Sequence, residues 1–178
     1  LETPLAKKIK RITIASKTIS NLYDDLTYLV LSHRVMSQNE EVSLASLLEE
    51  RIEYFSLLIE SKKLSLSTHY EAKPILLIDR KKISKVIDNI LSNAIKYNKI
   101  GGLIRIDVHT KSLSIKDSGV GIEEAKLGLV FERYSRFNTS VGGFGIGLNI
   151  VALIAKEYDL HVSISSQLNE GTEVVISW

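Results

Sequence analysis

Apolar residues recur every seven positions along the first 36 residues of the chain. One series consists of Leu5, Ile12, Ile19 and Leu26, and the other of Ala15, Leu22, Leu29 and Met36. This register is typical of a helix that buries a seam against a partner helix. We predict one helix of about 30 residues and roughly 45 Å, with Pro4 in its first turn and Thr3 as N-cap. A second copy of the chain is the simplest partner; a helix that lies on its own domain is the alternative.

The polar stretch "MSQNEEVS" separates this helix from the rest of the chain. Its composition predicts a linker. We therefore divide the chain into a dimerisation helix (1–36), a linker (37–43) and a second domain (44–178).

Helices and strands alternate in the second domain. Apolar residues at helical spacing predict helices over 44–60 and 80–98 and a last helix that opens at the glycines 142–147. Alternating or short apolar runs predict strands over 64–70, 74–79, 103–109, 112–117, 161–165 and 172–178. The fold class is α+β, a two-layer α/β sandwich in which helices cover one face of a mixed sheet, preceded by a long coiled-coil-like helix.

Composition narrows the classes of function. The 178 residues are 44% hydrophobic and 25% charged with a net charge of +2, so no basic excess indicates a nucleic-acid partner. The absence of cysteine excludes disulfides and thiolate metal sites. No run of about eighteen apolar residues is present to span a membrane. The sequence does not begin with Met, so we expect a fragment whose parent carries any membrane segment.

A carboxylate ends one predicted row of core-facing side chains. Strand alternation places Leu113, Ile115 and Asp117 on the same face. A buried carboxylate without a donor is costly, so an amino group is expected to meet it. Gly119 and Gly121 would let a flat ligand approach the backbone closely. The alternative is an ordinary Asp turn.

The predicted helix 80–98 carries polar residues beside its apolar face. Asn89, Asn93 and Lys96 follow one another at spacings of four and three. Two asparagines one turn apart have poor helix propensity, but their oxygens suit a hard cation while the lysine reaches a phosphate. A solvated polar stripe explains the pattern equally well. Tyr97 would stack on a base or pack.

Two further stretches suit anions. Arg133 and Arg136 lie between aromatic residues, and guanidinium groups match phosphate oxygens, although surface arginines are common. The stretch "GGFGIG" then puts four glycines within six residues ahead of the last helix. The free N–H groups and the dipole of that helix would form an anion site. A flexible loop is the alternative.

Taken in this order, the motifs resemble the ATP-binding catalytic domain of sensor histidine kinases, in the wider group of gyrase, Hsp90 and MutL ATPases. "DNILSNAIKYN" resembles the N box, "DSGVGI" the first glycine box, "VFERYSRF" the F box and "GGFGIGL" the second glycine box. The resemblance covers about 42–178.

The N-terminal helix resembles the dimerisation and phosphoacceptor helices of the same family. "LETPL" resembles the end of the H box, H-E-x-x-T-P-L, which would place the phosphoacceptor histidine and its acid upstream of Leu1. The residues from Arg11 resemble the second helix of the family's hairpin, so the hairpin tip is missing. We predict that the histidines outside this motif are non-catalytic: His33, His69, His109 and His161.

The resemblance implies a role for each motif residue. Asn93 would ligate a Mg²⁺ that bridges the ATP phosphates, with Asn89 beside it. Lys96 would contact a phosphate, Tyr97 would flank the nucleotide, and Asp117 would accept a hydrogen bond from the adenine amino group.

The remaining implied contacts lie mainly at the phosphates. Arg133 and Arg136 would approach them, with Arg136 favoured, while the lid that precedes the last helix would be short. The other implied nucleotide-binding residues are Gly119, Gly121, Ile122, Gly143, Gly145, Gly147 and Leu148.

The implied activity is phosphoryl transfer from ATP to a histidine for relay to the receiver domain of a response regulator. The protein would form a homodimer through its N-terminal helix and be the cytoplasmic fragment of an inner-membrane sensor. Thr3 would position water for dephosphorylation of the response regulator.

Two alternatives remain. ATP-hydrolysing relatives place a glutamate one turn before the magnesium asparagine, where this chain has Asn89, which argues against hydrolysis. A non-catalytic scaffold would not need Asn93, Asp117 and the glycines together.

Overall fold

The structure is a computed structural model that describes residues 3–31, 37–131 and 145–178. The chain divides into two compact units, Leu1–Met36 and Ser37–Trp178, and each is described by itself. Among the described residues, no helix combines the length and the apolar character that crossing a membrane requires.

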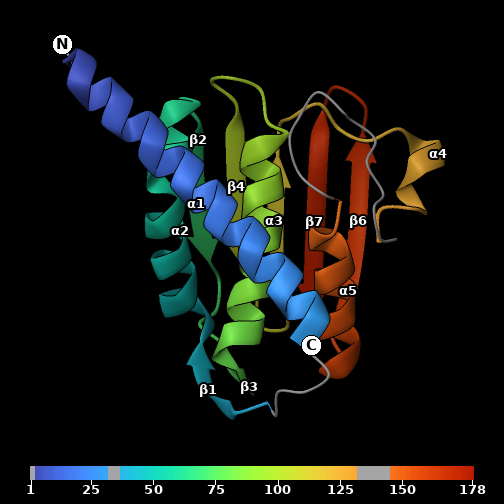
Figure 1. Ribbon diagram of the computed structural model, residues 1–178. Helices are drawn as coiled ribbons and strands as arrows, with labels where there is room; N and C mark the ends of the chain where they lie inside the picture. The colour runs from blue at the N-terminus through green and yellow to red at the C-terminus, as the bar shows by residue number, and fades with distance from the viewer. Residues whose placement is uncertain (1–2, 32–36, 132–144) are drawn as a thin grey trace. The chain divides into compact units, whose positions relative to one another are not determined.

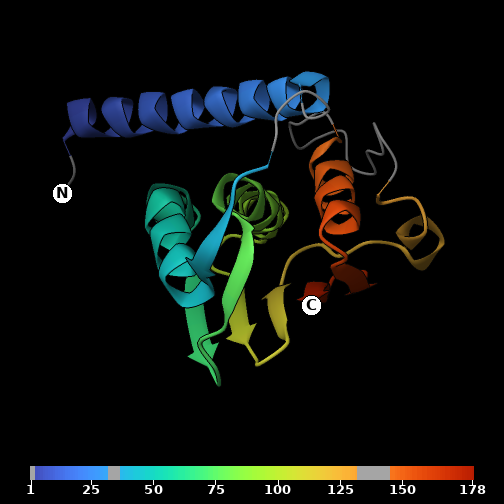
Figure 2. The same cartoon turned by 90° about the horizontal axis from the view of Figure 1, so that it is seen from below.

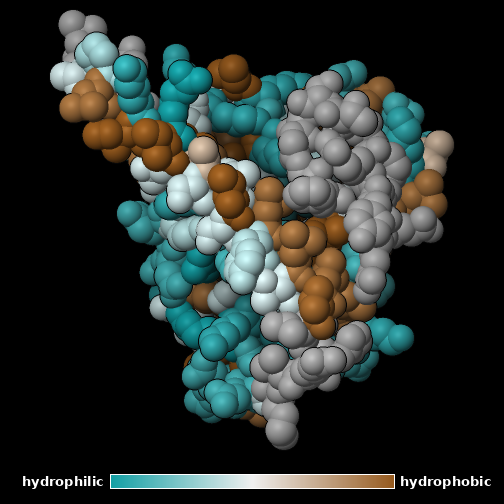
Figure 3. All heavy atoms as spheres, viewed as in Figure 1, coloured by the Kyte–Doolittle hydropathy of each residue, from teal (hydrophilic) through white to brown (hydrophobic). Residues whose placement is uncertain are grey.

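The first unit is helix α1, Pro4–Leu31. Thr3 caps it, because its Oγ1 accepts a hydrogen bond from the Ala6 N–H at 3.2 Å. Apolar side chains remain exposed along the helix, and those near its N-terminus form brown groups at the upper left of Figure 3. They include the whole first heptad series and several neighbours: Leu5, Ile9, Ile12, Ile19, Tyr23, Leu26 and Val30. Residues 32–36, also expected to be helical, lie outside the described residues.

The second unit is a two-layer sandwich. Helices α2 (Leu44–Ser61), α3 (Arg80–Lys96) and α5 (Gly147–Glu157) cover one face of a five-stranded sheet (Figures 1 and 2). The sheet contains, in spatial order, β2 (Ser65–Tyr70), β4 (Leu103–Val108), β5 (Ser112–Asp117), β7 (Gly171–Ser177) and β6 (His161–Gln167). The β2–β4 pair is parallel and the others are antiparallel, which confirms the predicted α+β class with a mixed sheet.

The core lies between the helices and the sheet. The apolar face of α3 is buried in full and consists of Ile83, Val86, Ile87, Ile90 and Ala94. It meets side chains from alternate positions of the central strands, such as Ile104, Ile106, Leu113 and Ile115. Burial of this continuous apolar layer is the main source of stability for the unit and holds α3 in place.

The structure differs from the expected linker at 37–43. Asn39–Ser43 forms strand β1, which pairs antiparallel with β3 (Ile75–Asp79) in a separate two-stranded sheet. Only Val42 is buried on β1, so the strand has no apolar alternation to reveal it. Its partner lies more than thirty residues along the chain, and local sequence carries no sign of that pairing.

A short helix, α4 (Glu124–Leu127), also follows the glycines of the β5 loop without having been predicted. It contains four residues, too few for a helical period to be recognised in the sequence.

Candidate functional site

The candidate site lies where α3 ends and α5 begins. The two helices run side by side in opposite directions, so the C-terminus of α3 and the N-terminus of α5 share one end of the sandwich (Figure 1). The end of β5 and the turn between β6 and β7 lie at the same end (Figure 1). Most of the motif residues therefore converge here.

Asp117 is a buried carboxylate at the last position of β5. It is 8% exposed and shares its burial with Leu113 and Ile115, as the strand alternation predicts. Burial raises the pKa of Asp117, although hydrogen bonds from the Gly119 and Thr172 N–H groups act against that rise. Gly119 N lies 2.7 Å from Asp117 Oδ1. Among the described residues, no lysine or arginine forms an ion pair with this carboxylate, so it retains capacity to accept a ligand's hydrogen bond.

The main chain of the loop after Asp117 packs directly against the main chain of two other segments. A β-carbon on Gly119 would overlap the carbonyl oxygen of Tyr97, at the end of α3. The Val120 N–H donates to that same oxygen at 3.1 Å. Gly121 has a φ of +67°, and a β-carbon there would overlap the Gln167 carbonyl. These glycines are therefore required by close approach within the protein, in addition to any approach of a ligand.

The β6–β7 turn closes the far side of this loop. Asn169 N–H donates to Val120 O at 2.7 Å, and the Ile122 N–H donates to Ser166 Oγ at 2.8 Å. A β-carbon on Gly171 would overlap the Asp117 carbonyl. Sequence reasoning recognised the turn but missed these contacts and the Thr172 bond, because each joins segments about fifty residues apart.

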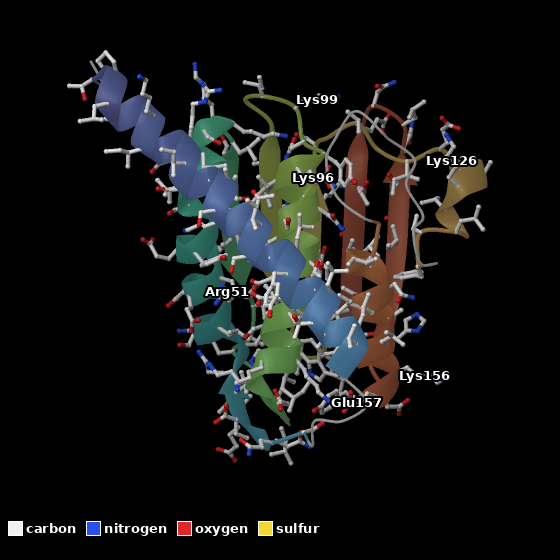
Figure 4. All side chains as sticks on the ribbon, viewed as in Figure 1. Arg51, Lys96, Lys99, Lys126, Lys156 and Glu157 are labelled. Carbon is white, nitrogen blue, oxygen red and sulfur yellow. The ribbon has the colours of Figure 1, made fainter. Side chains whose placement is uncertain are left out.

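Helix α3 brings the two asparagines and a lysine to the same end. Asn89 is buried at 8% exposure, and its Nδ2 donates to Lys85 O at 3.0 Å, which leaves Oδ1 toward Gly147. Asn93 is half-buried, and within the described residues its side chain forms no hydrogen bond. Lys96 Nζ donates to Tyr97 OH at 2.8 Å and lies 4.5 Å from the centre of that ring (Figure 4).

Helix α5 begins without a side-chain cap. Its N-cap residue, Ile146, is buried and has no side chain that could accept a hydrogen bond from the N–H groups of the first turn, and Gly145 before it has a φ of +69°. The first N–H groups and the positive end of the helix dipole thus face the site. Leu148 is half-buried in this turn, and Asn149 Nδ2 donates to Phe131 O at 3.1 Å, which ties the helix to the start of the F-box stretch.

The structure does not place all of the predicted residues at this site. Arg133, Arg136 and Gly143 lie outside the described residues, as does His33. Thr3 belongs to the first unit. His69, His109 and His161 lie toward the opposite end of the sheet, where His109 Nδ1 is 2.5 Å from Glu71 Oε2.

The few possible metal ligands at this end suit a magnesium ion that is bound mainly by phosphate and water. Among the described residues, no cluster of three or more histidine, aspartate or glutamate side chains is placed to hold a metal. Mg²⁺ is often held by few protein oxygens together with substrate phosphates. The unbonded Asn93 amide, with Lys96 one turn away, fits that pattern.

Sequence comparison places the chain among ATP-binding proteins. The family described as "Histidine kinase-, DNA gyrase B-, and HSP90-like ATPase" matches residues 78–178. The sensor protein RprX of Bacteroides fragilis is 31% identical over 149 residues, which cover 78% of this chain and 29% of RprX. The sensor histidine kinase AtsR of Burkholderia thailandensis is 30% identical over 186 residues, covering 96% of this chain and 31% of AtsR. The chain thus spans less than a third of either relative.

Solved structures show the same fold. Full-length ShkA in complex with AMPPNP is similar with a TM-score of 0.78 at 18% identity, covering 99% of this chain and 39% of ShkA. The histidine kinase ThkA in complex with the response regulator protein TrrA is similar with a TM-score of 0.69 at 21% identity, covering 99% of this chain and 52% of ThkA.

Proposed function

Because this chain belongs to the family of histidine kinase-, DNA gyrase B- and HSP90-like ATPases, we propose that it is the catalytic portion of a sensor histidine kinase. It binds Mg-ATP and transfers the γ-phosphoryl group to a histidine, for relay to a response regulator. The observation that carries this proposal is the buried Asp117 carboxylate, which accepts hydrogen bonds only from backbone N–H groups among the described residues and lies at the same end of the sandwich as Asn93 and Lys96.

Asp117 binds the adenine end of the nucleotide. Its carboxylate accepts a hydrogen bond from the exocyclic amino group, which offsets the cost of burying the charge. The loop from Gly119 to Gly121 lies next to this carboxylate and presents no side chain at either glycine. Tyr97 flanks the nucleotide from the end of α3.

Asn93, Lys96 and the start of α5 serve the phosphates. The amide oxygen of Asn93 would ligate Mg²⁺, and the N–H groups of the first turn of α5 would donate hydrogen bonds to the phosphate oxygens. A bound Mg²⁺ neutralises charge that develops on the phosphate oxygens. The family resemblance implies that Arg133, Arg136 and Gly143 also approach the phosphates.

In the transfer, an imidazole nitrogen forms a bond to the γ-phosphorus while the bond from that phosphorus to the β–γ bridging oxygen breaks. ADP leaves with the electron pair, and the imidazole loses its proton to a carboxylate base beside the acceptor histidine. None of the four histidines in residues 1–178 lies in the H-box pattern, so the substrate imidazole comes from elsewhere. This chain contributes orientation of the nucleotide and stabilisation of charge.

ATP hydrolysis is the competing activity, and Asn89 disfavours it. The position one turn before the magnesium asparagine would have to supply a base for water. Asn89 has an amide there, which does not accept a proton, and the amide nitrogen is already bonded to Lys85 O.

The exposed seam of α1 supports a homodimer. Leu5, Ile12 and Ile19 are 66%, 69% and 67% exposed, and such a stripe is buried when a second helix packs on it. Thr3, at the start of this helix, serves dephosphorylation of the receiver domain. The complex of ThkA with a response regulator protein supports a receiver domain as partner. We place the parent protein in the inner membrane with this portion in the cytoplasm.

A transfer assay tests the kinase activity. The chain is incubated with γ-labelled ATP, Mg²⁺ and a version of its parent that carries the phosphoacceptor histidine but no catalytic domain. Label on that histidine is expected, and Asp117→Asn should reduce it. Release of inorganic phosphate without transfer would support an ATPase instead, and neither product would support a scaffold.

A further inference from the structure

Lys62 caps helix α3 from outside. It follows α2 directly, and its Nζ donates to three main-chain oxygens: Ile95 O at 2.9 Å, Lys96 O at 2.6 Å and Asn98 O at 3.2 Å. The last carbonyls of a helix have no partner within the helix and form the negative end of its dipole. An ammonium group has three N–H donors, so Lys62 places all of them on the end of α3.

The one carbonyl that Lys62 omits belongs to the candidate site. Tyr97 O, between the Lys96 and Asn98 oxygens, accepts the hydrogen bond from Val120 N–H. Peptide planes are rigid, so fixing the neighbouring carbonyls restricts the direction of the one between them. Lys62 on one side and the Val120 loop on the other thus bind four consecutive carbonyls, two in the last turn of α3 and two just after it.

The main chain of Lys62 holds the other end of the same segment. Its carbonyl accepts a hydrogen bond from Gly101 N–H at 2.9 Å. Lys63, the next residue, has a φ of +54°, which turns the chain sharply out of α2. The C-termini of α2 and α3 lie at the same end of the sandwich (Figure 1). The segment from Ile95 to Gly101 is therefore fastened at both ends by one residue.

We propose that Lys62 is a positioning residue for nucleotide binding, because it holds the end of α3 at the spacing from the Asp117 loop that a bound nucleotide must bridge. This inference rests on the proposed function. Lys62 does not contact the nucleotide. It acts indirectly, because it binds the carbonyl of Lys96 and a carbonyl on each side of Tyr97.

The test compares variants of the chain in nucleotide titrations. Lys62→Met removes all three donors and is expected to weaken binding of Mg-ADP roughly ten-fold, because charged hydrogen bonds of this kind are lost. Lys62→Gln keeps one donor and should lie between Lys62→Met and the wild type. The matched control is Lys63→Met, which removes the same charge from the adjacent, exposed residue and should bind as the wild type does.

Amide hydrogen exchange separates this role from a general effect on stability. A lysine that only stabilised the fold would change exchange equally throughout the unit. Amide exchange at Val120 should accelerate in Lys62→Met more than exchange in the central strands, since the Tyr97 carbonyl loses its fixed direction. Should Lys62→Met not fold, Lys62→Gln carries the same comparison. Wild-type affinity in either folded variant, or exchange that rises equally everywhere, would overturn the inference. A wild type that binds no Mg-ADP would overturn the proposed function itself.

Discussion

Gly147, the first residue of α5, faces Asn89 of α3 so closely that a β-carbon on the glycine would overlap the asparagine Oδ1. This contact joins the N-box helix to the second glycine box. The asparagine is held by its bond to Lys85 O, so it would have to give up that bond to make room. The glycine therefore sets the spacing of the two helices at the end that we propose binds the phosphates.

Gly147→Ala tests that spacing. Alanine favours a helix by up to about 1 kcal/mol over glycine, which offsets the displacement of Asn89, so the free energy of unfolding should change by less than about 1 kcal/mol. Affinity for Mg-ADP should nevertheless fall roughly ten-fold, or about 1.4 kcal/mol, in calorimetric titration. Gly128→Ala is the control, because a β-carbon there meets nothing within 4 Å. Equal affinities of the two variants would contradict the spacing role.

Asp117→Asn should weaken nucleotide binding by at least about ten-fold, because the variant loses a charge-assisted hydrogen bond in a buried site. Stability should change little at neutral pH, since the ionised carboxylate is costly to bury. The direction in which stability changes with pH follows from the raised pKa of Asp117. Its contribution to stability is full below the ordinary value of 3.8 and is lost as pH rises through the folded-state value. Asparagine should remove that decline in denaturant titrations, and an unchanged nucleotide affinity would refute the role.

Asn93→Ala should abolish most of the advantage that Mg²⁺ gives to nucleotide binding. The change removes the proposed oxygen ligand and leaves the helix intact, because alanine is the best helix former. Affinity for ADP is measured with Mg²⁺ and again with a chelator. Ser92→Ala, one residue earlier on α3, should keep the wild-type ratio of the two affinities. If the wild type bound ADP equally well with and without Mg²⁺, Asn93 would not be a magnesium ligand.

At the N-terminal end of α3, the contact between Lys82 and Glu157 should be lost in acid. Lys82 is buried, and its Nζ donates to Glu157 Oε1 and Ser37 Oγ at 2.5 and 2.6 Å. Burial acts to raise the pKa of Glu157, but the hydrogen bonds that its carboxylate accepts from Lys82 Nζ and, at 2.8 Å, from Ser37 Oγ outweigh burial and lower the pKa below 4.5. The stabilisation is present above pH 4.5 and is lost as pH falls through the lower, folded-state value.

Glu157→Gln should therefore flatten the acid side of the stability profile. Because Glu157 is partly exposed, its removal should cost only about 1 kcal/mol at neutral pH. Chemical unfolding between pH 3 and pH 7 measures both effects. The exposed Glu53→Gln serves as the control and should follow the wild-type profile. Parallel profiles for Glu157→Gln and the wild type would show that the pair contributes nothing.

Sequence patterns located the parts of the site that depend on local periodicity. Strand alternation placed Asp117 in the core, and helical spacing put Asn89, Asn93 and Lys96 near one another. Strand β1 escaped because its pairing with β3 depends on distant residues and not on its own polar pattern. The contacts of Thr172 and Lys62 were not predicted for the same reason. One acts through a main-chain N–H that any residue but proline would supply, and the other resembles a surface lysine in "SKK".

The overlaps at Gly119, Gly121 and Gly171 have an evolutionary consequence. A β-carbon at each would meet a main-chain oxygen, which no rotamer change can move aside. Selection at these three positions therefore includes a constraint from packing and, at Gly121 and Gly171, from a positive φ, whichever nucleotide or partner the protein serves. Relatives that had abandoned catalysis would still have to keep these glycines in order to fold, whereas Asn93 would be free to drift.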